Sequence, residues 1–418
     1  MPSSNASALT LNYGTGPAMH AYYANYVGNG NLGSGFTAWC YNKPTSMPAG
    51  RQSPVKDGVG RPPTSCTITT PLTTLGTGRY RIDVANGATL GDYFVTVQTI
   101  GSNAMCFEES TTMVGTALQS VVRCVNPADG ANVDAKFAWF YRTDSLSYPQ
   151  DWPNYLLKSA YARVNLSGSL VSSQSFNPMT THTVSAARIS GAAVGRFRVT
   201  FKDLNPLDGS VDPNTLANDI IVTKTCDGDS NAACSRSVCV ADSWQSGTFS
   251  NADTTVDVSC FDRDGNYRDT GFRVFAGSES FSDQAWSAGG DNNSRDYHFG
   301  WANLTNYTAS GTQTLGVTAH RNQHESPWDD YPSLATQVTR SGTGRYTADF
   351  SGTFYHIDDA IPIVTSRGGS AIASSAALRG SYCNVWQVNS DPGSLDIRCY
   401  NRGGGSQVNV PWNVSVVY

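Results

Sequence analysis

One short stretch of the sequence has the residue types of a cation site. The segment "DRDGNYRD" runs from Asp262 to Asp269, and Asp264 and Asn266 lie between its ends. Calcium prefers several closely spaced oxygen ligands, and a glycine between them lets the chain turn tightly. These four side chains therefore predict a calcium site, and calcium is the one cofactor that the sequence suggests. Asp, Asn and Gly are also the residues that an ordinary hairpin turn prefers, so that second interpretation stays open.

The histidines gather in one other place. The segment "HRNQHESPWDD", residues 320–330, contains an HxxxH spacing. This spacing binds zinc when a helix places both imidazoles on one face, but Pro327 and a preceding strand pattern disfavour a helix. A polar loop is therefore the favoured interpretation. The sequence also lacks GxSxG, GDSGG and the SxDxGxTW box of sialidases, and nothing pairs a nucleophile with a base at a recognisable spacing, so we do not expect an enzyme.

Aromatic residues in loops and linkers indicate a binding function. Several of them lie beside carboxylates or amides in the segments "YPQDWPNY", "DQAWSAGG" and "ESPWDDY". An exposed aromatic ring stacks on the C–H face of a sugar while neighbouring polar groups meet its hydroxyls. The same aromatics could instead wedge neighbouring structural units together. The predicted carbohydrate-binding residues are Trp152, Tyr155, Trp286, Trp328, Asp329 and Asp330.

The ten cysteines divide into pairs, three of which recur along the chain. No pair has CxxC spacing and no cysteine lies in a histidine cluster, so structural disulfides are favoured over zinc ligands. An even set of this kind is typical of an oxidising compartment, and we expect a secreted protein. The recurring pairs are Cys106 with Cys124, Cys239 with Cys260, and Cys383 with Cys399; the two further pairs are Cys40 with Cys66 and Cys226 with Cys234.

The elements that would position these residues come in three copies. The phrases "LGTGRYRIDV" (75–84), "AAVGRFRVTF" (192–201) and "SGTGRYTADF" (341–350) are followed by the same arrangement of apolar runs and cysteines. Such a period is the mark of a repeat architecture. The predicted repeats are residues 1–150, 151–285 and 286–418, and they leave no room for a separate domain.

Each copy is predicted to be all-β. Alternating runs such as "RYRIDV", "FVTVQT" and "LDIRCY" have the period of two that strands require, and the glycines of "GTGRY" suit a tight hairpin. About eight such runs per copy suggest two four-stranded meanders, and six of these would make a six-bladed β-propeller. The N-terminal strand "SALTLNY" would complete a blade begun by the C-terminal strands. Three tandem β-sandwiches are the alternative architecture.

Composition narrows the possible partners. The net charge is −5 and no Lys/Arg cluster is dense enough to follow a phosphate backbone, so nucleic acid is not an expected partner. No run of 18 apolar residues occurs, so membrane insertion is not expected. The segment that follows Met1 lacks the features of a signal peptide, so export would use another route or act before this chain begins.

The repeated phrases resemble those of secreted, lectin-like β-repeat proteins of bacteria, chiefly actinobacteria and myxobacteria. The matching segments are "FGWAN" (299–303), "VTRSGTGRYTADF" (338–350), "SVCVADSW" (237–244) and "VSCFDRDGNYRDTGFRVF" (258–275), and the first copy departs most. The resemblance implies a secreted, disulfide-bearing repeat protein, sometimes joined to other extracellular modules, and it implies no catalytic residues.

Two classes of function follow from these observations. The first is a secreted carbohydrate-binding protein that recognises cell-surface or extracellular glycans through several weak loop sites whose avidity comes from multivalency. The alternative is a structural or assembly subunit of an extracellular filament or a secreted toxin complex, in which loops bind other secreted protein chains.

Overall fold

The fold is built almost wholly of strands. The computed structural model describes residues 10–11, 20–26, 37–40, 66–68, 73–84, 93–115, 117–143, 159–177, 183–191, 194–204, 219–226, 232–245, 253–277, 297–315, 320–325, 336–350, 361–389 and 393–417. Within these ranges only three short helical turns accompany the strands. The all-β prediction is confirmed.

Among the described residues the first predicted repeat contains ten strands, the second seven and the third nine. Those of the first repeat are β1 (Thr10–Leu11), β2 (His20–Tyr26), β3 (Thr37–Cys40), β4 (Cys66–Ile68), β5 (Thr73–Gly76), β6 (Arg79–Val84), β7 (Phe94–Ile100), β8 (Met105–Val114), β9 (Ala117–Val125) and β10 (Lys136–Thr143). β1 pairs with β4, so the short N-terminal strand adds to its own repeat and not to the C-terminal strands as predicted.

The second repeat contains seven strands and two helical turns. They are β11 (Ser159–Val164), η2 (Ser172–Gln174), β12 (Val184–Arg188), β13 (Arg196–Phe201), β14 (Asp219–Thr225), α1 (Ala232–Ser235), β15 (Val238–Gln245), β16 (Thr254–Phe261) and β17 (Gly271–Gly277). The third contains β18 (Tyr297–Leu304), β19 (Gly311–Thr314), β20 (His320–Glu325), β21 (Gln337–Gly342), β22 (Arg345–Asp349), β23 (Ile361–Ser366), α2 (Ser370–Ser374), β24 (Tyr382–Asn389), β25 (Ser394–Tyr400) and β26 (Trp412–Val417).

Each repeat forms two groups of hydrogen-bonded strands. In the third repeat one group has the order β19-β21-β22-β25-β24 and the other β20-β18-β26-β23. The corresponding groups are β5-β6-β9-β8 and β3-β2-β10-β7 in the first repeat, and β12-β13-β16-β15 and β11-β17-β14 in the second. Neighbours within these groups are antiparallel but are often distant in the sequence. The predicted meanders of consecutive strands are therefore wrong, because the chain passes from one group to the other between strands, and no sheet among the described residues closes on itself.

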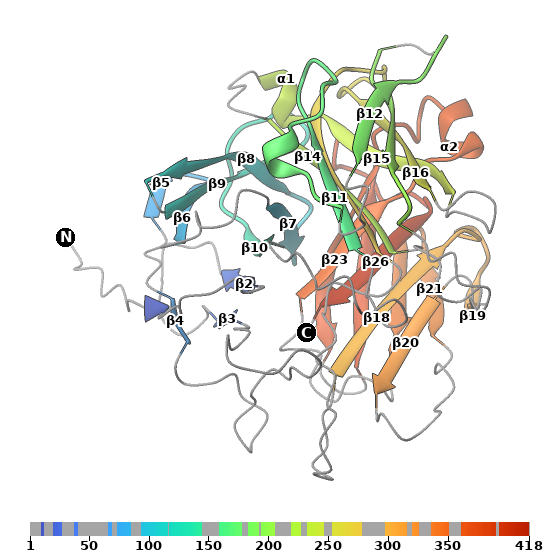
Figure 1. Cartoon of the computed structure of the whole chain (residues 1–418). Helices are drawn as coiled ribbons and strands as arrows, with labels where there is room; N and C mark the ends of the chain where they lie inside the picture. Colours follow the sequence, from blue (N-terminus) through green and yellow to red (C-terminus); the bar gives the residue numbers. More distant parts are fainter. Residues whose placement is uncertain are drawn as a thin grey trace.

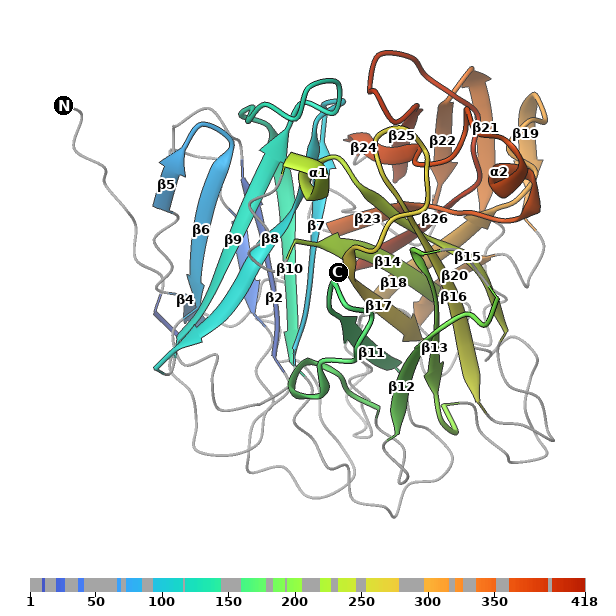
Figure 2. The same ribbon diagram turned by 90° about the horizontal axis from the view of Figure 1, so that it is seen from above.

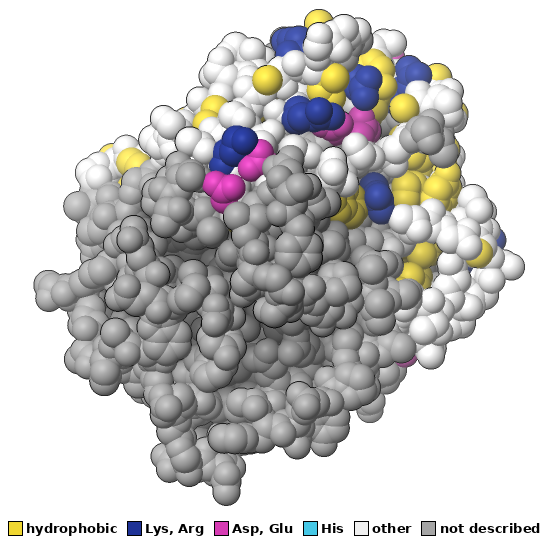
Figure 3. Space-filling model, turned by 45° about the vertical axis from the view of Figure 1, so that its right-hand side comes forward, with side chains coloured by type: hydrophobic (Ala, Val, Ile, Leu, Met, Phe, Trp, Pro, Cys, Tyr) yellow, Lys and Arg dark blue, Asp and Glu magenta, His cyan; other side chains and the backbone are white. Residues whose placement is uncertain are grey.

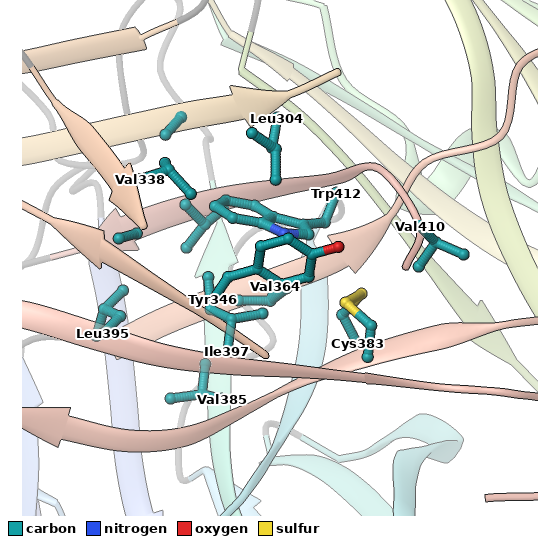
Figure 4. Packing of buried hydrophobic residues seen from close by; sticks show 14 of the residues in the cluster. Leu304, Val338, Tyr346, Val364, Cys383, Val385, Leu395, Ile397, Val410 and Trp412 are labelled. Carbon is teal, nitrogen blue, oxygen red and sulfur yellow. A yellow bond between two sulfur atoms is a disulfide. The ribbon is translucent and has the colours of Figure 1, made fainter. Parts of the chain in front are cut away.

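The two groups of a repeat share one hydrophobic core. In the third repeat, Trp412 of β26 lies against Tyr346 of β22, with 5.8 Å between the ring centroids. Figure 4 shows these rings among aliphatic side chains that come from both groups of strands, such as Val364 of β23 and Ile397 of β25. The first and second repeats have equivalent cores built from both of their groups.

Four of the predicted disulfides are present. Three join directly paired residues of neighbouring strands with Cα atoms 4.0 Å apart: Cys106 with Cys124, Cys239 with Cys260, and Cys383 with Cys399. The fourth, Cys226 with Cys234, closes a short loop before β15. Cys40 ends β3 and Cys66 begins β4, but their side chains lie outside the described residues.

The recurring "GTGRY" phrase forms the hairpin that was predicted. Its second glycine has a positive φ in every copy, 65° at Gly78, 77° at Gly195 and 63° at Gly344. A Cβ atom at Gly344 would lie 2.6 Å from the carbonyl oxygen of Cys399, and Gly78 has the same relation to Cys124. Only glycine therefore fits this turn.

The three repeats occupy three sectors around a common centre. Figure 1 shows the first repeat in blue and teal, the second in green and the third in orange and red. Figure 2 shows the same three sectors from above, with β7, β14 and β23 near the middle. The inner strands of the three repeats are therefore the natural place to look for a shared site.

Candidate functional site at the axis of the repeats

Three equivalent strand contacts join the repeats. In each contact, two strands of neighbouring repeats run parallel to each other. One of them, β8, β15 or β24, carries the first cysteine of a recurring disulfide. The other, β14, β23 or β7 respectively, comes just before the equivalent cysteine in the sequence of the next repeat. The bridged residues are Glu108 with Thr225, Ala241 with Arg367, and Val385 with Ile100. Because the last contact returns from the third repeat to the first, the repeats form a ring about an approximate threefold axis.

Backbone hydrogen bonds and β-bulges mark the same three places. The N–H groups of Cys226, Gly368 and Gly101 donate to the carbonyl oxygens of Glu108, Ala241 and Val385 at 3.3, 2.8 and 2.9 Å. In β8, β15 and β24 the pairing register shifts directly after the bridged residue. A bulge bends its strand, so these three bulges turn the strands toward the neighbouring repeat.

Two apolar clusters fill the space between the repeats. The first combines side chains of all three, namely Phe94, Ala138, Tyr161, Ile221, Phe275 and Ile363. The second contains Met105, Phe107 and Val125 of the first repeat together with Val238, Val240 and Phe261 of the second and Tyr382 and Tyr400 of the third. The burial of this apolar area stabilises the contacts between the repeats.

A cavity of about 90 Å³ lies at the ring's centre and is called the axial cavity below. It is lined by residues of β7, β8, β14, β15, β23 and β24 and by Ser237 just before β15. Along β7, Val95 and Val97 belong to the core of their own repeat, whereas Thr96 and Gln98 alternate with them and face the axis. The positions equivalent to Gln98 in the other repeats are Thr223 and Thr365, which also line the cavity.

The polar side chains that line the axial cavity differ in whether they have hydrogen-bond partners. The Gln98 side chain accepts a hydrogen bond from the Val364 N–H at 2.7 Å and donates to the Thr99 carbonyl at 3.0 Å, so it ties the first repeat to the third. The Thr96 hydroxyl is buried and has no hydrogen-bond partner among the described residues. A buried polar group without a partner is costly unless something outside the protein satisfies it.

A buried lysine stands at the junction of the first two repeats. The Lys224 ammonium donates to the carbonyl oxygens of Ser235 at 2.6 Å and Cys234 at 3.2 Å, and it lies 3.9 Å from the centroid of the Phe107 ring. Burial lowers the pKa of Lys224 well below its usual value, and the positive charge of Arg123 lowers it further. The equivalent residues of the other repeats are Thr99 and Ser366, so this charge occurs in one repeat only.

An ion pair is buried at the same junction. The Arg273 guanidinium donates to both carboxylate oxygens of Glu108, at 2.6 and 2.8 Å, and also to the Tyr93 carbonyl and the Gln174 side chain. Burial alone would raise the pKa of Glu108, but the charge and hydrogen bonds of Arg273 outweigh it and leave that pKa lowered. The pair joins β8 of the first repeat to β17 of the second.

The junction of the second and third repeats contains a buried carboxyl group with no cationic partner among the described residues. The Ser415 hydroxyl donates to Asp219 at 2.8 Å, and nearby the Asn413 side chain donates to the Ile220 carbonyl at 3.2 Å. Burial raises the pKa of Asp219 to about 8, and the Ser415 hydrogen bond only partly opposes this. Asp219 is therefore protonated at neutral pH.

Three of the four predicted calcium ligands, Asp262, Asn266 and Asp269, have side chains that are hydrogen-bonded within the protein. The Asp262 carboxylate accepts the backbone N–H groups of Asp264 at 2.8 Å and Asn266 at 2.9 Å. Asp269 accepts the Gly195 N–H at 2.7 Å and forms a two-point ion pair with Arg188, which lowers the pKa of Asp269. No group of three or more His, Cys, Asp or Glu side chains suited to a metal ion occurs in the described part of the chain. The contacts of these residues thus follow the turn interpretation.

The role of Asp269 recurs and was not foreseen from the sequence. Asp134, Asp269 and Asn409 occupy equivalent positions, and each accepts the N–H of the second glycine in a "GTGRY" hairpin at 2.7 Å: Gly78, Gly195 and Gly344 respectively. The signal was present, because an Asp or Asn follows the second cysteine of every recurring pair at nearly the same spacing.

The predicted carbohydrate-binding residues, Trp152, Tyr155, Trp286, Trp328, Asp329 and Asp330, all lie outside the described residues. His320 and His324 lie in β20, so their segment is a strand and not the helix that an HxxxH zinc site would need. On the face shown in Figure 3, Lys and Arg side chains of the described surface lie apart from one another, some beside acidic side chains. No described helix is long and apolar enough to cross a membrane.

Comparison with known proteins found no match to a family model, a curated protein or a solved structure. The function therefore has to be argued from the chain's own residues.

Proposed function

We propose that the protein is a secreted, lectin-like binding protein in which a ring of three repeats holds several carbohydrate-binding loops at fixed separations. The observation that carries the proposal is the set of three equivalent parallel contacts that join the repeats into a ring. A ring of this kind places equivalent loops of the three repeats at three positions around one axis. Weak sites held in this way gain avidity through multivalency.

The finer architecture belongs to the same proposal. We infer that each repeat is a β-sandwich, the alternative considered from the sequence, rather than two blades of a propeller. Three features support this: the strands of each repeat divide into two groups, both groups contribute to one core, and the chain passes several times from one group to the other. Loops that connect the strands then emerge at the ends of each sandwich, where binding residues are commonly found.

The charged groups at the axis support a binding protein more than an enzyme. Glu108 pairs with Arg273, Asp219 pairs with Ser415, and the Lys224 ammonium is bonded to two backbone carbonyls. The Glu108–Arg273 and Asp219–Ser415 contacts each join one repeat to another, and the Lys224 ammonium lies 3.9 Å from the centroid of the Phe107 ring of the first repeat, so each group already has a structural role. Carbohydrate is proposed as the ligand class because the sequence has aromatic residues beside polar residues in its predicted loops. The four disulfides are consistent with an extracellular location.

The proposal is tested by comparing the oxidised protein with a Trp152→Ala, Trp286→Ala and Trp328→Ala triple variant on a glycan array. We expect the parent to bind a defined glycan class and the triple variant to lose most of that binding while keeping its circular dichroism spectrum and melting temperature. A matched control replaces the exposed apolar residues Leu75 and Val114 with alanine and should bind as the parent does.

Two results would count against the proposal. If the triple variant still binds glycans, the carbohydrate-binding sites do not depend on Trp152, Trp286 and Trp328. A parent that binds no glycan, but forms larger species as its concentration rises in light-scattering measurements, would instead favour a subunit of an extracellular assembly.

A further inference from the structure

The axial cavity has room for a ligand. Its volume is about 90 Å³, whereas a single water molecule requires roughly 10–15 Å³ by the same measure. It lies where the inner strands of all three repeats meet, so a bound group there would contact the whole ring. This site is separate from the loops that would bind carbohydrate.

The lining of the cavity favours negative charge. The described residues that line the cavity include neither Asp nor Glu. Apart from the phenol of Tyr382 and the cysteines, which are all in disulfides, Lys224 is the ionisable side chain among them. The positive charge of Arg123 also acts on Lys224. The Lys224 ammonium is bonded to neutral carbonyl oxygens, which stabilise a cation but do not neutralise its charge. A positive charge buried without a counter-ion is unfavourable, which is why the pKa of Lys224 is lowered, and an anion nearby would favour the charged form of this side chain.

Hydroxyl groups supply the direct contacts. The Thr96 hydroxyl is buried, faces the axis and has no hydrogen-bond partner among the described residues. Thr223 and Thr365 line the same cavity from the other two repeats. A hydroxyl can donate to an anion as readily as to water, and a hydrogen bond to a charged acceptor is stronger than one to a neutral acceptor.

We propose that the axial cavity binds a small monovalent anion, with chloride as the probe, through the hydroxyl of Thr96 and together with a proton on Lys224, the ionisable amine that lines the same cavity. The size of the cavity excludes large organic anions. The bound anion would stabilise the ring because it satisfies a group from the first repeat and a charge from the second.

The test measures the melting temperature of the full oxidised chain at constant ionic strength while sodium gluconate is replaced by sodium chloride or bromide. We expect the melting temperature to rise with halide concentration and to saturate, as ligand binding to the folded state requires. Thr96→Val should weaken the apparent affinity by about tenfold, since it removes one charge-assisted hydrogen bond. Thr336→Val is the matched control, because the Thr336 hydroxyl is equally buried and unpartnered among the described residues but does not line the cavity.

These variants distinguish anion binding at a specific site from a general effect of salt on stability. A halide response that is equal in the parent, Thr96→Val and Thr336→Val would overturn the proposal, as would a melting temperature that does not depend on the anion. Crystals grown in bromide provide the direct measurement: an anomalous peak in the axial cavity is the expected result, and a cavity without one at saturating bromide contradicts it.

Discussion

At the scale of single residues, the junctions of the repeats differ from one another although the repeats are equivalent. Glu108 stands where the other repeats have Ala241 and Val385, and Asp219 stands where the first repeat has Phe94. Each of these exceptions is buried at a contact with a neighbouring repeat. The three junctions are therefore chemically distinct, and each polar exception should respond to substitution in its own way.

The carboxyl group of Asp219 should make stability depend on pH. Its pKa is raised to about 8 in the folded protein, whereas an unfolded chain releases this proton near pH 4. Between these values the folded state binds one proton more than the unfolded state, so the free energy of unfolding falls as pH rises.

Asp219→Asn removes this titration while keeping an acceptor for Ser415. We expect the variant to unfold at a higher urea concentration than the parent at pH 8, and the difference should shrink steadily as the pH is lowered toward about 4. Urea titrations of both proteins across this range check the prediction. A difference that is independent of pH would show that Asp219 does not titrate as described.

Removing one partner of the Glu108–Arg273 pair should be costly because the other charge stays buried. We expect Arg273→Met and Glu108→Gln each to lower the free energy of unfolding by about 3–5 kcal/mol, and the double variant to lose less than the sum. The control is Arg198→Met in the exposed Arg198–Asp257 pair, which should cost no more than about 1 kcal/mol. Equal losses for Arg198→Met and Arg273→Met, measured by chemical denaturation, would contradict this account.

At the scale of strands and turns, the sequence predicted where many strands lie but not which strands pair with each other. The alternation in "RYRIDV" and "FVTVQT" indicated strands, and they are β6 and β7. Alternation fixes which side chains face a core, but it does not identify the neighbouring strand. The predicted meanders therefore joined consecutive strands, whereas β18, for example, also pairs with β26. The axial residues were missed for a similar reason, since Thr96 and Lys224 line one cavity only when the repeats close. A charged residue within the apolar run "DIIVTKT" was the one signal that pointed to them.

The "GTGRY" hairpin gives the sharpest test at this scale. Gly344 has a φ of 63°, and a Cβ atom there would lie 2.6 Å from the Cys399 carbonyl oxygen. We expect Gly344→Ala to lower the free energy of unfolding by about 2 kcal/mol or more, because both the backbone conformation and the contact disfavour a side chain. Gly405→Ala is the control, since nothing lies within 4 Å of its Cβ position. Similar unfolding midpoints for the two variants would contradict the proposed role of the turn.

At the scale of the whole molecule, the ring makes the three repeats interdependent. Phe94 of the first repeat is fully buried, and its ring lies 6.1 Å from that of Tyr161 and 5.8 Å from that of Phe275, both in the second repeat. Contacts of this kind exist only while the ring is closed. The repeats should therefore unfold together and not one by one.

Calorimetry can measure this interdependence. We expect the oxidised parent to show one transition with matching calorimetric and van't Hoff enthalpies. Phe94→Ala should lower the free energy of unfolding by about 3–5 kcal/mol and separate the first repeat's transition from the others. Three resolved transitions in the parent would mean that the repeats behave as independent domains.

The central claim is that a ring of three repeats binds glycans through several sites at once. Its most direct test is the apparent affinity of the oxidised protein for surfaces that carry its glycan ligand at high and at low density. The account predicts an apparent affinity that falls by roughly 10²–10⁴ when the glycans are too sparse for one molecule to engage two of them. An affinity that does not change with density, or no binding at any density, would contradict it.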